Sequence, residues 1–186
     1  RLASRQARAI SACTPARASL AERMPLVISC EHAGNRVPAS RRGLFEGAEG
    51  MLASHRGWDA GALELARGLA RRLAAPLIAT TTTRLLVDAN RSPSNPRVFS
   101  RFTAGLGADE RRALLAQYHA PHWQRVAAAL ADQCEDAPTG CVVHLSVHSF
   151  TPVWKGQRRQ ADIGLLYDPS RRGECAVVAR WIEAFA

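Results

Sequence analysis

Residues 26–35 read LVISCEHAGN, a short apolar run that ends abruptly in polar residues, with His32 just beyond it. Two other segments share this design: TRLLVDANRSP at 83–93 and CVVHLSVHSF at 141–150. Short apolar runs of this kind are typical of buried strands. Because the carboxyl ends of parallel strands meet at one edge of a sheet, the polar residues that follow the three runs are expected to converge.

Helical patterns separate these runs. Apolar residues recur at helical spacing from Asp59 to Leu73, with Asp59 at the position of an N-cap. Strands alternating with helices imply an α/β fold with a largely parallel sheet. The remaining expected elements are strands at Leu77–Thr80, Arg84–Val87, Gly140–Val147 and Ile163–Tyr167, and helices at about Asp109–Ala131 and Cys175–Phe185.

The composition favours one cytoplasmic domain. The chain has 186 residues, and its 5 cysteines have neither disulfide nor zinc-site spacing. Its segment 1–24 is rich in Arg, Ala and Ser and is expected to be a mobile basic leader before a single domain over 25–186. No run approaches the roughly 20 apolar residues of a membrane span. The net charge is +9, but the arginines are scattered and Lys155 is the only lysine, so no nucleic-acid partner is expected.

Two histidines are the first candidate metal ligands. His32 and His148 follow different apolar runs, so their imidazoles would lie at neighbouring strand ends and supply half or more of a zinc shell. A lone histidine beside an apolar run is more often a hydrogen-bonded structural residue. Two histidines in the same context favour a metal site. Because catalytic zinc takes three protein ligands, such a site requires a third ligand.

The chain resembles the N-formylglutamate amidohydrolase family from Leu26 to Arg172. The resemblance rests on the motifs SCEHAGNRVP, HRGWDAGA, TRLLVDANRSP, HLSVHSFTPVWKG and ADIGLLYDPSR. It implies a three-layer α/β/α fold like that of zinc carboxypeptidases, with a mixed, mostly parallel sheet and helices on both faces. It also implies a Zn²⁺ (or other divalent metal) hydrolase that releases formate, or another small acyl group, from an N-acylated acidic amino acid, and hence a small carboxylated substrate. Formylglutamate hydrolysis would place the protein in histidine degradation.

The third metal ligand departs from the carboxypeptidase pattern. The HxxE spacing of those enzymes would place it at Asn35, a poor zinc donor. Related muramoyl amidases take a carboxylate from the start of the next helix, where Asp59 stands, and Asp59 is the preferred ligand. The alternative is that Asp59 only caps its helix. Glu31 is a second candidate, but a residue adjacent to His32 on an extended strand points to the opposite face.

Asn90 and Arg91 are expected to bind the substrate carboxylate, because a guanidinium grips a carboxylate through two parallel hydrogen bonds. Arg91 is otherwise a surface charge that pairs with Asp88. Arg84 is a candidate catalytic residue that would stabilise a developing oxyanion, with a structural role as the alternative.

The other histidines are expected to play lesser parts. His144 lies about 13 Å from His148 on an extended strand, too far to share its ion, and should be buried and hydrogen-bonded. His55 should support the site indirectly. His119 and His122, with Trp123, form a cluster on a helix that is more typical of packing.

The general base is the missing part of the resemblance. Enzymes of this architecture carry a glutamate on a later strand, and no residue of this chain is assigned to that role. The expectation is therefore a chain that lacks its C-terminal portion. The alternative is a catalytically incompetent, binding-only protein on the same scaffold. The oligomeric state is not predicted.

Overall fold

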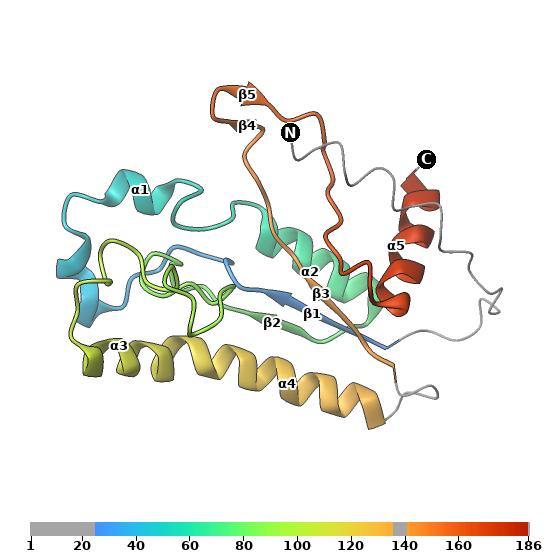
Figure 1. The fold of residues 1–186 in the computed structure, drawn as a ribbon, viewed down its shortest axis with the longest axis horizontal. Helices are drawn as coiled ribbons and strands as arrows, with labels where there is room; N and C mark the ends of the chain where they lie inside the picture. The colour runs from blue at the N-terminus through green and yellow to red at the C-terminus, as the bar shows by residue number, and fades with distance from the viewer. Residues whose placement is uncertain (1–24, 136–140, 186) are drawn as a thin grey trace. The chain divides into compact units, whose positions relative to one another are not determined.

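The computed structural model describes residues 25–135 and 141–185, which divide into two compact units at Thr151–Pro152. The expected leader, 1–24, lies outside the described residues. The first unit contains, in chain order, β1 (Leu26–Cys30), the 3-10 helix η2 (Ala39–Phe45), α1 (Glu49–Ala53), α2 (Ala62–Leu73), β2 (Leu77–Ala79), α3 (Ala108–Leu114), the π-helical turn η3 (Leu115–His119), α4 (Ala120–Glu135) and β3 (Val143–Ser146) (Figure 1). The second unit contains β4 (Val153–Trp154), β5 (Gln157–Arg158) and α5 (Arg172–Phe185).

The first unit is built on a parallel sheet with the strand order β2-β1-β3. Strand β1 pairs with β2 through Ile28 and Leu77, and with β3 through Leu26 and Val143. The chain therefore leaves β1 for one neighbour and later returns to its other side. This change of direction creates a switch point at the carboxyl end of β1, which is where ligands bind in open α/β sheets.

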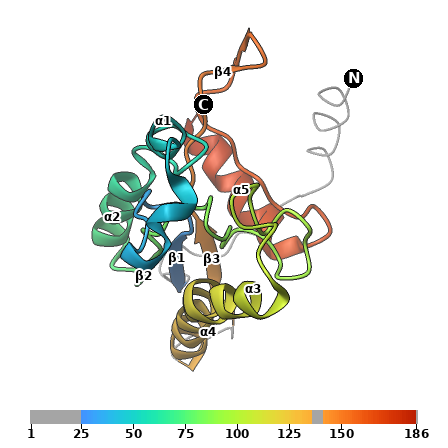
Figure 2. The ribbon, with the colours of Figure 1, turned by 90° about the vertical axis from the view of Figure 1, so that its left-hand side faces the viewer.

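Helices cover the two faces of this sheet. Ile28 and Cys30 of β1 pack with Ala62 and Ala66 of α2, and all four are buried. On the other face Val27 packs with Ile78 of β2 and Val126 of α4. The alternation of side chains along β1 thus serves two helices, and Figure 2 shows α2 and α4 on different sides of the strands. The α/β fold and the parallel pairing are confirmed.

Two expected strands are absent. Residues 84–87 form a turn instead, since Thr83 accepts from Leu86 N–H through its backbone carbonyl and its hydroxyl donates to the Gly57 carbonyl at 2.9 Å. Local turn bonds therefore replace ladder bonds. Residues 163–167 also lie outside any strand, and Leu166 is 96 % exposed. The apolar run is present, but within the described residues no partner strand pairs with it.

The sheet also differs from the expected mixed sheet, because its three strands are all parallel and the antiparallel pair β4–β5 is separate. The expected helix at 109–131 is one helical rod over 108–135 that changes pitch at η3. No helix in the part of the chain that the structure describes has the length and apolar content of a membrane span.

Candidate metal centre

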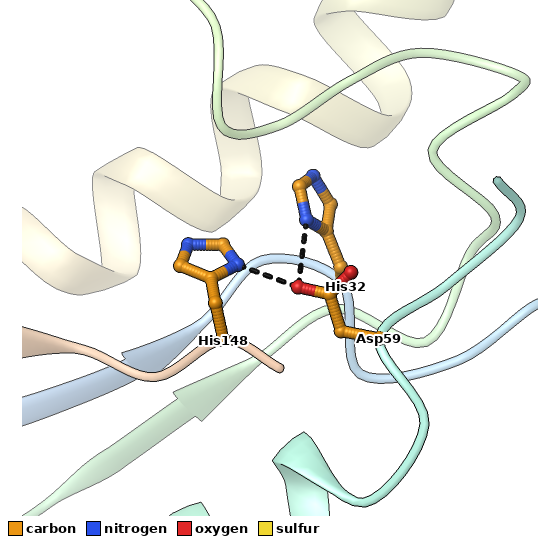
Figure 3. A group of neighbouring side chains, drawn as sticks. All are labelled: His32, Asp59 and His148. Atoms are coloured by element: carbon orange, nitrogen blue, oxygen red, sulfur yellow. Dashed lines mark hydrogen bonds and ion pairs between the residues drawn. The ribbon is translucent and has the colours of Figure 1, made fainter. Parts of the chain in front are cut away.

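Three side chains converge beyond the carboxyl ends of β1 and β3. His32, Asp59 and His148 each offer one ligand atom, and these atoms all lie within 4.8 Å of one another. Nδ1 of His148 lies 2.8 Å from Oδ2 of Asp59, and Nδ1 of His32 lies 3.4 Å from the same oxygen (Figure 3). His32 and Asp59 are buried, and His148 is partly exposed. The structure thus brings together the three residues that the sequence selects as metal ligands.

The backbone fixes this arrangement at two close approaches. The N–H of Asp59 donates to the carbonyl of His32 at 3.0 Å, which links the turn before α2 to the end of β1. A Cβ on Gly57 would lie 2.3 Å from the Leu52 carbonyl oxygen, and a Cβ on Gly34 would lie 2.8 Å from that of Thr81. Both glycines are therefore required because the neighbouring chain is too near for a side chain.

Asp88 orients His32. Its Oδ1 lies 2.7 Å from Nε2 of His32, and a carboxylate only accepts, so Nε2 carries the proton. Burial would raise the pKa of Asp88, but hydrogen bonding to His32 and the charges of His32 and Arg84 lower it to about 2. Nδ1 of His32 is then the ring nitrogen that faces the cluster. Carboxylates commonly hold metal-binding histidines in this way.

His148 is oriented in the same manner. Its Nε2 lies 3.0 Å from Oγ of Ser146 and 3.3 Å from Oε2 of Glu31, and its Nδ1 faces Asp59. Burial would lower the pKa of His148, but hydrogen bonds to Asp59 and Glu31 raise it to about 9. The proton between Nδ1 of His148 and Oδ2 of Asp59 therefore occupies the position that a metal ion bound to both groups would take.

A second polar cluster, the Glu31 network, lies next to the metal centre and comprises Ser29, Glu31, His122 and Ser146. Both serine hydroxyls donate to Glu31 at 2.5 Å, and Nε2 of His122 lies 3.3 Å from Oε1. Burial would raise the pKa of Glu31, but these bonds and that from His148 hold it well below its usual range. Glu31 is thus a fully buried carboxylate whose oxygens are already occupied.

Arg84 and Arg91 surround Asp88 beside the metal centre. Arg84 contacts Asp88 Oδ2 at 3.2 Å and Asp59 Oδ1 at 3.4 Å. Nε of Arg91 donates to the same Asp88 oxygen at 3.1 Å, which is the pairing named as the alternative to carboxylate binding. The backbone N–H of Asn90 donates to Asp88 Oδ1 at 3.0 Å, and Asn90 is exposed. All three candidates therefore lie near the metal centre. Arg84 belongs to a turn and not to the strand that was expected at 84–87.

A cavity of about 410 Å³ opens beside Arg84, Asp88 and Arg91. Five arginines line it, together with Asp88; they are Arg56, Arg84, Arg91, Arg97 and Arg101. Such a concentration of guanidinium groups around one acid favours an anionic ligand with more than one negative group.

The surroundings of Asp59 and of three other histidines are also defined. Asp59 does not cap α2, because the helix begins at Ala62 and its N-cap is Gly61. His144 bonds Ser29 Oγ at 2.8 Å, as expected, but it is only partly buried. Nε2 of His55 lies 3.4 Å from Asp59 Oδ1, in line with the supporting role expected of it. His122 is more than packing, since it bonds Glu31 and, at 2.9 Å, Thr80.

Asp88 is the partner of His32, a role that was not predicted from the sequence. The sequence indicates Asp88 only as a partner of Arg91. The available signal was the position of Asp88 after an apolar run, the same context that selected both histidines. Asp88 bonds His32, Arg84 and Arg91, and it can do so because residues 84–87 form a turn. A strand at 84–87, as expected from the sequence, did not predict these contacts.

Comparisons with known proteins agree with this geometry. Residues 24–186 match the family model described as N-formylglutamate amidohydrolase. The structure is similar to the crystal structure of gene product Atu2144 from Agrobacterium tumefaciens, with a TM-score of 0.70 and 32% sequence identity. The match covers 80% of this chain and 61% of that one, so this chain spans less than two thirds of that protein's length. No curated protein matches the chain.

Proposed function

The chain belongs to the N-formylglutamate amidohydrolase family, and on that premise we propose that it hydrolyses the amide of an N-acylated acidic amino acid. N-formylglutamate is the proposed substrate, and formate and glutamate are the products. We further propose that zinc or another divalent cation is the cofactor, that the full fold resembles that of zinc carboxypeptidases, and that the protein acts in the cytoplasm on a step of histidine degradation.

The observation that carries the proposal is the donor set of the metal centre. Two imidazole Nδ1 atoms and one carboxylate oxygen face one another, and the far nitrogen of each histidine is held by a carboxylate. Nitrogen and oxygen donors in this number suit a catalytic zinc site, which keeps a further position for water. The donor set therefore fits the metal that the family implies.

When bound by His32, Asp59 and His148, a divalent metal would lower the pKa of a water molecule and polarise the amide carbonyl. The protein's own groups would bind and orient the substrate. Arg84 is the proposed residue that stabilises negative charge developing on the carbonyl oxygen, and its position between Asp59 and Asp88, where it is 24% exposed, supports this role.

The arginine-lined cavity supports an acidic substrate. We propose that Arg91, with Asn90, binds the α-carboxylate, and that the other arginines of the cavity attract the side-chain carboxylate. A substrate with two carboxylates would offset the charge of these guanidinium groups better than one with a single carboxylate.

One observation favours the alternative, a binding-only protein. Glu31, Asp59 and Asp88 are the carboxylates around the metal centre among the described residues, and each is buried and bonded to a histidine. None of the three is free to act as a general base.

The test measures metal content and formate release from N-formylglutamate in one preparation of the protein. Wild type should carry about one zinc per chain and release formate, and His148→Ala should do neither. His144→Gln, on the same strand four residues earlier, serves as the control and should keep its metal. Metal without turnover would support the binding-only alternative, and wild type without metal affinity would refute the metal centre.

A matched substrate pair tests the carboxylate preference. N-formylglutamine has almost the shape of N-formylglutamate but lacks the side-chain charge. We expect kcat/KM to fall by a factor of about 100 for the amide, because buried or partly buried charged hydrogen bonds contribute about 1.5–3 kcal/mol each. Equal kcat/KM values for the two substrates would contradict the role given to the cavity.

A further inference from the structure

The loop that carries Asn90 and Arg91 is attached to a neighbouring helix at two points. Nε2 of His119 lies 2.8 Å from the carbonyl oxygen of Arg91, and Nε1–H of Trp123 donates to the carbonyl of Ala89 at 2.8 Å. A carbonyl oxygen only accepts, so His119 donates through Nε2–H. The two anchored carbonyls stand on either side of Asn90.

These anchors connect the loop to the sheet. His119 is the last residue of η3 and Trp123 belongs to α4, four residues later, so both project from one face of the helical rod. On this rod Val126 packs against Val27 of β1 and Ile78 of β2. His119 is 5% exposed, which shields its hydrogen bond from competition by water.

We propose that His119 and Trp123 are positioning residues that hold Asn90 and Arg91 in the orientation required to bind the substrate carboxylate. The inference rests on the proposed function. Neither side chain has a contact with His32, Asp59 or His148 among those described, so they act on substrate binding through the loop backbone. Without the donor the Arg91 carbonyl would be left unpaired, and the loop would move to find a new partner.

A pair of nearly isosteric variants separates the hydrogen bond from the volume of the side chain. His119→Gln keeps an N–H close to the position of Nε2, and His119→Met removes it. For His119→Met we expect KM for N-formylglutamate to rise about tenfold, the effect of one lost hydrogen bond. Its kcat should change by less than about twofold and its zinc content should stay at the wild-type level, because the metal ligands are unaffected. His119→Gln should recover most of the wild-type KM.

Trp123→Phe is the second variant, and it decides the question if His119→Met fails to fold. It removes the donor to Ala89 and keeps an aromatic ring, and it should raise KM in the same direction. An unchanged KM in both donor-free variants overturns the inference. So does a loss of kcat and zinc in parallel with KM, or a His119→Gln variant no better than His119→Met, because a purely structural role would produce these results.

The design also separates this inference from the proposed function. If wild type binds N-formylglutamate in calorimetry without turnover, hydrolysis is refuted, and the same comparison is made on Kd in place of KM. If wild type neither binds nor hydrolyses N-formylglutamate, the proposed function fails and the inference is overturned with it.

Discussion

Glu31 and His32 are neighbours in the sequence, yet they belong to two clusters of opposite character. The metal centre and the Glu31 network each contain a buried histidine and a buried carboxylate. In the network, hydroxyl and imidazole groups donate hydrogen bonds to the oxygens of Glu31. In the metal centre, the Nδ1 atoms of two histidines face one oxygen of Asp59, and the Nε2 atom of each histidine is hydrogen-bonded elsewhere. Residue type alone therefore does not make a metal site. The direction of each imidazole and the occupancy of its second nitrogen decide it.

The largest expected effect is a break in the metal centre that spares the network. Asp59→Asn removes the anionic ligand but keeps the shape of the side chain, so metal affinity should fall by at least about 10³-fold and turnover should disappear. Circular dichroism should show an intact fold. Metal titration by calorimetry provides the measurement, and wild-type affinity in this variant would exclude Asp59 as a ligand.

Glu31→Gln disrupts the Glu31 network and keeps all three metal ligands. The carboxylate is fully buried among four donors, so removing its charge should lower the free energy of unfolding by about 3 kcal/mol. Metal affinity should fall by no more than about 100-fold, because Glu31 holds the far nitrogen of His148 together with Ser146 but is not itself a ligand. Urea denaturation checks the loss of stability. A variant that is stable but metal-free would show that Glu31, the second candidate from the sequence, is itself a ligand.

Asp88→Asn tests the support of a metal ligand rather than the ligand itself. The amide can still accept from His32 but lacks the charge that holds the imidazole, so metal affinity should fall about 10- to 100-fold. The dissociation constant of Co²⁺, followed by its absorption spectrum, gives the value. A loss as large as that of Asp59→Asn would mean that Asp88 has been assigned to the wrong part of the centre.

The smallest expected effect is the change in metal affinity per pH unit. The pKa of His148 is raised to about 9 in the metal-free protein, so a cation must displace a proton below that pH. Metal affinity should rise about tenfold per pH unit up to pH 9 and then level off, since one proton is released. In Glu31→Gln one of the interactions that raise this pKa is lost, so the plateau should begin at lower pH. A pH-independent affinity would contradict this assignment.

The same raised pKa makes the stability of the metal-free fold depend on pH. Because the folded-state value lies above the ordinary value of 6.5, protonated His148 stabilises the folded chain. That contribution is fully present below about pH 6.5 and is lost as the pH rises through about 9. The melting temperature of the metal-free protein should therefore decline over this range, and His148→Ala should remove the decline.

The sequence predicted those parts of the molecule that depend on local pattern. The apolar runs at β1, β2 and β3 fixed the parallel strands, and His32 and His148 followed from their position at strand ends. The alternation of side chains placed Glu31 on a different face from His32, and the structure gives it His122 of α4 as a partner, though its Oε2 also lies 3.3 Å from His148. Asp59 came from the comparison with muramoyl amidases, and its geometry here shows no capping.

Other parts depend on contacts that no local pattern contains. The run at 84–87 is as apolar as a strand, but the Thr83 hydroxyl and the Gly57 carbonyl, 26 residues apart in the chain, convert it into a turn. That turn places Asp88 against His32 and both arginines. The Glu31–His122 contact likewise joins residues 91 positions apart, and tertiary packing alone creates it.

The π-helical turn η3 has a consequence for how this family can diverge. It amounts to one additional residue in the rod that runs from α3 to α4, and one residue rotates everything beyond it by about 100°. Leu114 before the turn and Val126 after it serve different apolar clusters, so the rotation lets one rod satisfy both. A single-residue deletion within 115–118 would leave α3 in place and swing His119 and Trp123 away from the loop. If His119 and Trp123 position the loop as we propose, a change in chain length alone would alter substrate binding and leave every side chain of the metal centre intact.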